Sequence, residues 1–266
     1  MQIKNLMSED LITIDKDQNI TDALKLLRKN NISRLPVTNK KELVGIISER
    51  DIANKLGSSK YENMPASRLH ISSVMVKDVL TVPQTMQLHD VAKLMLEKGI
   101  GSVPVMDEDK MIGIVSKADF TTLAVGTAFD KITVNELMTR DLTTVSPTER
   151  LVHARRLMID AKVGRLPVVE DDELIGMVTS KDLMRAYIDF KKNTPEKHQK
   201  SQIKEIFVDS IMSSNPTYTS EDASITEVAK IMIETGYNGL PVVGEGKVIG
   251  IITQTDILRL IEKLES

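Results

Sequence analysis

Two spacings of apolar residues alternate along the chain, and the alternation recurs four times. A short stretch rich in β-branched residues (LITI, VLTV, LTTV or PTYT) predicts a strand, and the segment after it carries apolar residues three and four positions apart. The clearest examples of this helical spacing are Leu88, Val91, Met95 and Leu96, and Ile225, Val228, Met232 and Ile233. Two apolar runs around a polar turn (TNKK, DEDK, EDDE or GEGK) then predict a β-hairpin, and a second helix begins near an aspartate. The predicted order is therefore β-α-β-β-α.

The four segments align without gaps on one proline each, at Pro36, Pro104, Pro167 and Pro241. A glycine follows each proline by nine positions, a hydroxyl residue by twelve and an aspartate by fifteen, and a methionine precedes it by twenty-nine. Only the linkers differ, with 68, 63 and 74 residues from one proline to the next. The chain is therefore predicted to be four copies of one unit.

The repeats are predicted to span residues 1–60, 69–127, 131–190 and 205–266. A three-stranded sheet of this size cannot bury its own apolar face, so each repeat is expected to need a partner. The polar stretch 191–202 (KKNTPEKHQKSQ) is expected to be a loop between repeats 3 and 4.

Composition narrows the range of functions. The chain has 35 basic and 38 acidic residues, which leaves no basic excess for a nucleic-acid backbone. It has no cysteine, and its four histidines show no paired spacing, so no metal site is expected. The start of the chain does not resemble a leader and the apolar runs are short, which predicts a cytoplasmic protein that is not inserted in a membrane.

The proline motif, followed by the glycine, the hydroxyl residue and the aspartate, resembles that of the cystathionine β-synthase (CBS) domain family, and it does so four times. The resemblance implies an α/β (α+β) fold in which repeats 1 and 2, and repeats 3 and 4, form two tandems with ligand clefts between paired sheets. The two tandems are expected to pack as a pseudo-fourfold disc around a central channel, an organisation similar to that of the γ subunit of AMP-activated protein kinase.

The resemblance also implies that the motif aspartates hold the two ribose hydroxyls of a nucleotide, because a carboxylate offers two acceptor oxygens. The alternative is that each aspartate only caps the second helix, where this residue type is favoured without any ligand. The matching residues are Asp51, Asp119, Asp182 and Asp256.

Phosphate contacts are expected from two arginines that lie two positions before the proline, since arginines at this place contact phosphate in the kinase γ subunit and a guanidinium matches phosphate oxygens. The alternative is an exposed arginine at a strand end. The predicted phosphate set is Arg34, Arg165, Ser48, Ser116, Lys117, Thr179, Lys181 and Thr253. Repeats 2 and 4 have Ser102 and Gly239 in place of the arginine.

The resemblance implies that threonines of the first strand contact the purine and phosphate, although ordinary strand threonines would look the same in sequence. The predicted purine pockets contain Thr13, Thr81, Thr144, Tyr218 and Tyr237. Repeat 4 departs most from the pattern, because it lacks the arginine and carries both tyrosines.

These residues predict a regulatory module without catalytic activity and without a cofactor, which binds AMP, ADP or ATP and reports energy state to a protein target that the sequence does not identify. The alternatives are a sensor of S-adenosylmethionine or methylthioadenosine, and a scaffold or nucleic-acid-binding CBS protein. An enzyme is not expected, since no residues remain for a catalytic domain. A homodimer remains open.

Overall fold

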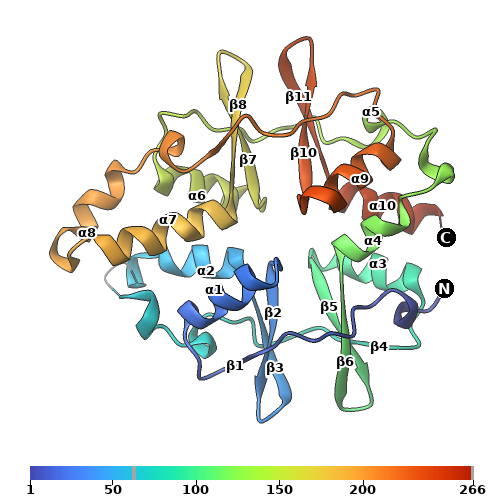
Figure 1. Cartoon of the computed structure of the whole chain (residues 1–266), viewed down its shortest axis with the longest axis horizontal. Helices are drawn as coiled ribbons and strands as arrows, with labels where there is room; N and C mark the ends of the chain where they lie inside the picture. Colours follow the sequence, from blue (N-terminus) through green and yellow to red (C-terminus); the bar gives the residue numbers. More distant parts are fainter. Residues whose placement is uncertain (62–63, 265–266) are drawn as a thin grey trace. The chain divides into compact units, whose positions relative to one another are not determined.

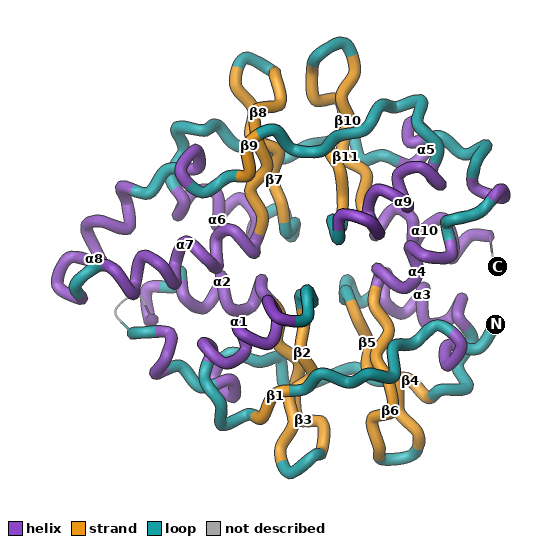
Figure 2. Tube along the Cα trace, viewed as in Figure 1, coloured by secondary structure: helices purple, strands orange, loops and turns teal. Residues whose placement is uncertain are grey.

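A computed structural model describes residues 1–61 and 64–264 (Figures 1 and 2). Repeats 1 and 2 have the expected order of elements, whereas repeats 3 and 4 have the expected helices and hairpin but no regular first strand. Repeat 1 contains β1 (Ile14–Asp15), α1 (Ile20–Lys29), β2 (Arg34–Asn39), β3 (Glu42–Ser48) and α2 (Glu49–Leu56). Repeat 2 contains β4 (Val82–Pro83), α3 (Leu88–Glu97), β5 (Ser102–Asp107), β6 (Lys110–Ser116) and α4 (Lys117–Leu123). The mixed α/β fold with four repeats is thus confirmed.

Repeat 3 contains α6 (Leu151–Asp160), β7 (Arg165–Glu170), β8 (Glu173–Thr179) and α7 (Ser180–Asn193). Repeat 4 contains α9 (Ile225–Thr235), β10 (Gly239–Gly244), β11 (Lys247–Thr253) and α10 (Gln254–Leu264). The remaining α-helices and strand are α5 (Val134–Leu137), α8 (Glu196–Gln202) and β9 (Ser213–Ser214), and short 3₁₀ helices occur in the connections. None of the helices in the described residues is both long and apolar enough to cross a bilayer.

The first strand of each repeat is shorter than the β-branched stretches suggest. Ile14 pairs in parallel with Val37, but in repeats 3 and 4 the equivalent pairing is reduced to single bridges, Val145 to Val168 and Thr219 to Val242. The hairpins are regular, and each carries a bulge after the valine that follows the motif proline. The hairpin is therefore the most regular part of each repeat's sheet.

The chain divides into two compact units that combine repeats two apart in sequence. Unit 1 contains residues 1–11, 79–142 and 217–266, and unit 2 contains residues 12–78 and 143–216. Each unit has its own apolar core, made mainly of aliphatic residues and methionines, with Phe120 in unit 1 and Tyr187 in unit 2. In unit 2 helices α2 and α7 pack on each other, and in unit 1 helix α10 packs on α3 and α4 (Figure 1).

The motif methionines do not pack within the repeat whose proline they precede. Met75, near the start of repeat 2, lies against Gly45 of repeat 1, and a Cβ atom on this glycine would come within 2.5 Å of the methionine Sδ. Met7, near the start of repeat 1, lies in the same way against Gly113 of repeat 2. Repeats 3 and 4 show the same exchange, between Met212 and Gly176 and between Met138 and Gly250. The invariant spacing of glycine and methionine in the four repeats therefore marks a close contact.

The polar stretch 191–202 is not a loop, and that expectation was wrong. Helix α7 continues to Asn193, and α8 begins at Glu196. Lys191 is buried and donates to the backbone oxygen of Tyr61 at 2.8 Å, while buried Gln199 donates to the backbone oxygen of Thr194 at 2.8 Å. These backbone acceptors explain how a strongly polar sequence can form packed helices here.

Candidate functional site

The hairpin places the predicted phosphate residues of a repeat opposite each other. Arg34 at the start of β2 is directly across the ladder from Ser48 at the end of β3, and Arg165 is across from Thr179. In the other two repeats the corresponding pairs are Ser102 with Ser116, and Gly239 with Thr253. Cβ atoms of directly opposite residues are about 4.5–5.5 Å apart, so the arginine and the hydroxyl can contact one ligand group.

The motif aspartates cap the second helices, as their alternative interpretation predicted. The Oδ2 atom of Asp51 accepts from the backbone N–H and the hydroxyl of Ser48, at 2.8 and 2.5 Å. The same pair of hydrogen bonds joins Asp119 to Ser116, Asp182 to Thr179 and Asp256 to Thr253. Capping uses one carboxylate oxygen only, so it leaves room for a ligand on the other.

The second carboxylate oxygen of the motif aspartate, Oδ1, has a different environment in repeat 4 than in the other three repeats. Within the described residues, no protein donor hydrogen-bonds to Oδ1 of Asp51, Asp119 or Asp182. In repeat 4, Arg259 donates to Oδ1 of Asp256 at 2.8 Å from one turn further along α10. A ribose could therefore reach the first three aspartates directly, but it would have to displace a guanidinium from Asp256.

The carboxyl group of Asp256 is also the most enclosed of the four. Its side chain is 3% exposed, and burial raises its pKa above the ordinary value, although hydrogen bonds from Thr253 and the charges of Arg259 and Lys117 oppose the rise. Lys117, a predicted phosphate residue, donates to the hydroxyl of Thr255 at 2.8 Å. The polar groups around Asp256 thus bond to one another.

Unit 2 gathers three arginines, Arg34, Arg50 and Arg165, which we call the arginine cluster. Burial lowers the pKa of Arg165 to about 10, and the charges of Arg50 and Arg34 add to the effect. The pKa of Arg34 is lowered by burial first and by Arg50 second, while Asp51 and Glu49 oppose the change. Neither predicted phosphate arginine is an exposed strand-end residue; both are partly buried, and the charge of Arg50 acts on both.

Lys181, the other lysine of the predicted phosphate set, lies near a carboxylate instead. Burial raises the pKa of Glu49, and the charge of Lys181 is the largest influence that opposes this rise, followed by a hydrogen bond from Ser33. Lys181 is therefore placed to neutralise Glu49, and its contact with phosphate stays a prediction.

The predicted purine residues lie beside the hairpins without contacting the aspartates by hydrogen bonds. Thr13 and Thr81 directly precede β1 and β4, and Thr144 precedes Val145, whose N–H donates to the backbone oxygen of Pro167 at 3.0 Å. Tyr218 and Tyr237 are 59% and 49% exposed, so both rings are accessible. Their role in purine binding remains a prediction.

Sequence reasoning missed two of these features. Arg259 lies three residues after Asp256, a spacing that brings side chains together on a helix and that could have been noticed. The position of Arg50 against repeat 3 had no signal in the sequence, because it depends on how α2 packs on α7. Among the described residues, no cluster of His, Cys, Asp or Glu could hold a metal ion.

The family model described as "CBS domain" matches four segments of the chain, residues 3–58, 71–126, 134–189 and 208–263. Protein MJ1225 of Methanocaldococcus jannaschii is 27% identical over 276 residues, which cover 97% of each chain. Protein MJ1404 of the same organism is 30% identical over 272 residues, covering 99% of this chain and 62% of the relative.

Two solved structures cover 98% of the chain and 100% of their own length at 25% identity. The crystal structure of MJ1225, described as a proposed archaeal homologue of g-AMPK, gives a TM-score of 0.85. A conserved protein from Pyrococcus horikoshii gives a TM-score of 0.66. The whole chain, including all four repeats, is thus similar in fold to MJ1225.

Proposed function

Since the chain belongs to the CBS domain family, we propose that it is a regulatory protein that binds adenine nucleotides in repeats 1, 2 and 3 and reports their concentration to a protein partner. CBS-domain pairs are regulatory ligand-binding modules, and proteins built from them are generally not catalytic. The similarity to MJ1225, with its proposed relation to the kinase γ subunit, supports a nucleotide as the ligand.

One observation carries the proposal: each of the first three motif aspartates caps its helix with Oδ2, and its Oδ1 has no protein donor among the residues that the structure describes. Two adjacent ribose hydroxyls are the donors that such an oxygen would accept, with about 1.5–3 kcal/mol for each charge-assisted bond. In repeats 1 and 3 an arginine stands across the hairpin to take the phosphate. Repeat 2 keeps the aspartate and Lys117 but has Ser102 there, so it is expected to bind charged nucleotides less tightly.

Repeat 4 is proposed to remain empty. Its aspartate is occupied on both oxygens, and Gly239 offers no cation for a phosphate. S-adenosylmethionine or methylthioadenosine, which need no phosphate arginine, would still have to displace Arg259. The hydrogen bond from Arg259 to Asp256 therefore argues against these alternative adenosyl ligands in repeat 4, which lacks the phosphate arginine.

Ligand binding can act on a partner only through its preference for one packing arrangement of the repeats over another. The experiment is isothermal titration calorimetry of the protein with AMP, ADP, ATP and S-adenosylmethionine, after mass spectrometry of what copurifies with the native protein. We expect nucleotide binding that weakens by about 10- to 100-fold when Asp51, Asp119 and Asp182 are replaced together by asparagine. Absence of binding for all three nucleotides at millimolar concentration would overturn the proposal.

A further inference from the structure

Repeat 3 ends in a longer second helix than the other repeats. Helix α7 has 14 residues, whereas the equivalent helices α2, α4 and α10 have 8, 7 and 11. Only Thr194 and Pro195 separate α7 from α8, which leads into a 3₁₀ turn at Ile203–Glu205. Of the residues of α8 only Gln199 is buried, so the apolar core of unit 2 does not account for this helix.

Polar contacts hold the bend between α7 and α8. The Nε2 atom of Gln199 donates to the backbone oxygens of Thr194 at 2.8 Å and of Lys191 at 3.3 Å, near the end of α7 where helical carbonyls lack intrahelical partners. Buried Lys191 donates from Nζ to the backbone oxygen of Tyr61 at 2.8 Å. The bend is therefore attached both to α7 and to the turn that follows repeat 1.

The exposed side of this bend is basic. Residues 191–205 contain five lysines, two glutamates and no arginine, although the chain as a whole has a net charge of −3. Lys197, Lys200 and Lys204 are exposed, and their spacing of three and four positions places them on one side of α8 and the turn after it. Exposed Lys192, at the end of α7, adds a fourth positive charge.

Tyr61 supplies an aromatic ring beside these lysines, because its backbone oxygen is the acceptor of Lys191. The Nζ atoms of Lys55 and Lys60 lie 4.5 and 5.5 Å from the centroid of its ring. Tyrosine is one of the residue types that contribute most to binding between proteins. We use the name lysine surface for five residues together: Tyr61, Lys192, Lys197, Lys200 and Lys204.

Carboxylates are the complement of the lysine surface. Seven helical positions rise about 10 Å, so an acidic helix with carboxylates at the same spacing could contact Lys197, Lys200 and Lys204 together. A nucleic-acid backbone fits less well, because phosphate is matched best by the planar fork of arginine, which residues 191–205 lack. The surface therefore favours an acidic protein segment.

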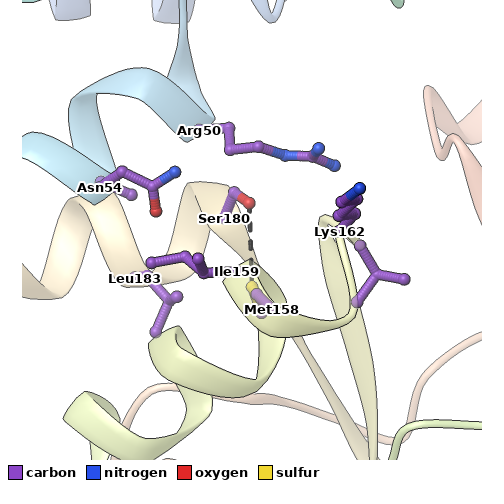
Figure 3. A pocket seen from close by; sticks show the side chains of 9 residues that line it. Arg50, Asn54, Met158, Ile159, Lys162, Ser180 and Leu183 are labelled. Carbon is purple, nitrogen blue, oxygen red and sulfur yellow. Dashed lines mark hydrogen bonds between the residues drawn. The ribbon is translucent and has the colours of Figure 1, made fainter. Parts of the chain in front are cut away.

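Helix α7 also connects the lysine surface with the proposed nucleotide site. Asp182 lies in its first turn, and Ser180 at its start lines, with Arg50 and Lys162, a pocket of about 210 Å³ that we count as part of that site (Figure 3). Fourteen residues make a helix about 20 Å long, so the two ends of α7 face different ligands. A shift of α7 would be felt at both.

We propose that the lysine surface is where a regulated protein partner docks, through an acidic segment whose carboxylates contact Lys197, Lys200 and Lys204. Its regulation rests on the proposed function: nucleotide bound at Asp182 shifts α7 and so changes the affinity of the lysine surface for the segment. By linkage, the segment changes the affinity for nucleotide by the same factor.

The probe is a fluorescein-labelled helical peptide rich in glutamate, followed by fluorescence anisotropy. A lysine-rich peptide of equal length, oligo(dT), and vesicles of phosphatidylcholine with phosphatidylserine serve as comparisons. We expect saturable binding of the glutamate peptide that weakens as salt is added, together with movement of the amide NMR signals of α8. Tighter binding of oligo(dT) or of the vesicles would overturn the choice of a protein partner. Movement confined to residues outside the lysine surface, or no binding at millimolar peptide, would overturn the site.

The key variant replaces Lys197, Lys200 and Lys204 together by glutamine, which is a good helix former. The affinity for the glutamate peptide should fall about tenfold, since three exposed charge pairs are lost. The matched control makes the same change at three exposed lysines of repeat 2. These are Lys93→Gln, Lys98→Gln and Lys110→Gln. Equal weakening in both variants would mean general charge attraction and would refute the lysine surface.

Titrations of the glutamate peptide with and without saturating AMP test the regulation. We expect its affinity to differ at least about fivefold between the two conditions, and an unchanged affinity would refute the coupling through α7. A protein that binds the peptide at α8 but binds no AMP would contradict the proposed function and leave the docking surface standing. A protein that binds AMP but not the peptide would refute the docking surface and leave nucleotide binding standing.

Discussion

The guanidinium of Arg50, in repeat 1, lies against the backbone of Gly164, in repeat 3, so closely that a Cβ atom on this glycine would come within 2.7 Å of Nη2. Gly164 directly precedes Arg165, whose pKa is lowered by burial and by the charge of Arg50. An arginine from one repeat thus contributes to the electrostatic environment of the predicted phosphate arginine of another. The two repeats of unit 2 share one positive region.

Replacing Gly164 tests whether this shared charge matters. Gly164→Ala should move the flexible end of Arg50 away and lower the affinity of repeat 3 for AMP on the order of fivefold, which corresponds to about 1 kcal/mol. Stability should hardly change, because only a side-chain end has to shift. Calorimetry measures the affinity, and Gly126→Ala is the control, since nothing lies within 4 Å of a Cβ atom there. Equal effects of both substitutions would contradict a role for Arg50.

Asparagine at the motif aspartates separates capping from ligand binding. Asp51→Asn keeps an oxygen that can accept from Ser48 but puts an NH₂ group, which cannot accept, where Oδ1 stood. Nucleotide affinity at that site should fall by about 10- to 100-fold, while the melting temperature stays close to that of the unchanged protein. Asp51→Ala should lower both, because it also removes the cap. If the asparagine variant binds nucleotide normally, the aspartate is only a cap.

The phosphate arginines are tested with a pair of ligands. Arg165→Gln should weaken AMP at repeat 3 by about tenfold or more and leave adenosine nearly unchanged, because only AMP loses a charge-assisted bond. Arg34→Gln should do the same at repeat 1. Parallel calorimetric titrations with the two ligands check this, with exposed Arg28→Gln as the control. An equal loss for adenosine would point to general damage to the fold.

Arg259→Met should make stability depend on pH around Asp256. The substitution removes a hydrogen bond to a charged group and should cost about 1.5 kcal/mol of unfolding free energy near neutral pH, the low end of the usual range because Arg259 is largely exposed. The folded-state pKa of Asp256 is already raised by burial, and loss of Arg259 raises it further. A raised pKa means that ionised Asp256 is less stable in the folded protein. The loss of unfolding free energy caused by Arg259→Met is therefore present above the pKa of Asp256 in the folded protein, and it disappears below the pKa of this residue in the unfolded chain.

Urea denaturation at a series of pH values measures that dependence. The deficit of Arg259→Met relative to the unchanged protein should shrink as the pH falls toward the ordinary range of an aspartate. The double variant Arg259→Met with Asp256→Asn should show a deficit that is independent of pH. A constant deficit in the single variant would exclude the ion pair as its cause.

The contact of Gly45 with Met75 predicts a coupled pair. Gly45→Ala should cost about 1–3 kcal/mol, since the new methyl group would meet the methionine Sδ at 2.5 Å and the backbone oxygen of Val76 at 3.0 Å. In the double variant, Met75→Ala should restore part of the stability that Gly45→Ala loses, because it removes the methionine Sδ, the atom nearest to the new methyl group. A double-mutant cycle by denaturation shows the coupling, and simple additivity of the two costs would contradict the contact.

The repeat architecture could be predicted from sequence because the motif spacing, the helical spacing of apolar residues and the polar turns all indicate the same unit. Helices α3 and α9 begin at Leu88 and Ile225, where the apolar spacing begins, and the hairpins follow from the apolar runs around polar turns. The stretch 191–202 was misread because its polarity suggested a loop, whereas the donor groups of Lys191 and Gln199 reach backbone acceptors that only the fold supplies. Charge alone does not distinguish a solvated loop from a helix with buried polar ends.

The candidate site could be predicted only as far as single repeats determine it. The position of Arg34 opposite Ser48 follows from the length of the hairpin turn, so the motif residues of one repeat come together as expected. The arginine cluster depends on packing between α2 and α7, which no spacing within a repeat reveals. The pairing of repeat 1 with 2 and of 3 with 4, and the disc that it implies, stay predictions.

The division of each unit between distant parts of the chain has a consequence for synthesis on the ribosome. The core of unit 2 joins residues 12–78 to residues 143–216, so repeat 1 leaves the ribosome without the surface it must pack against. At about 5–20 residues per second, it waits on the order of ten seconds for repeat 3 to emerge. During that time the apolar face of α2 is open to chaperones and to other nascent chains, so aggregation during translation should be most sensitive to substitutions in this helix.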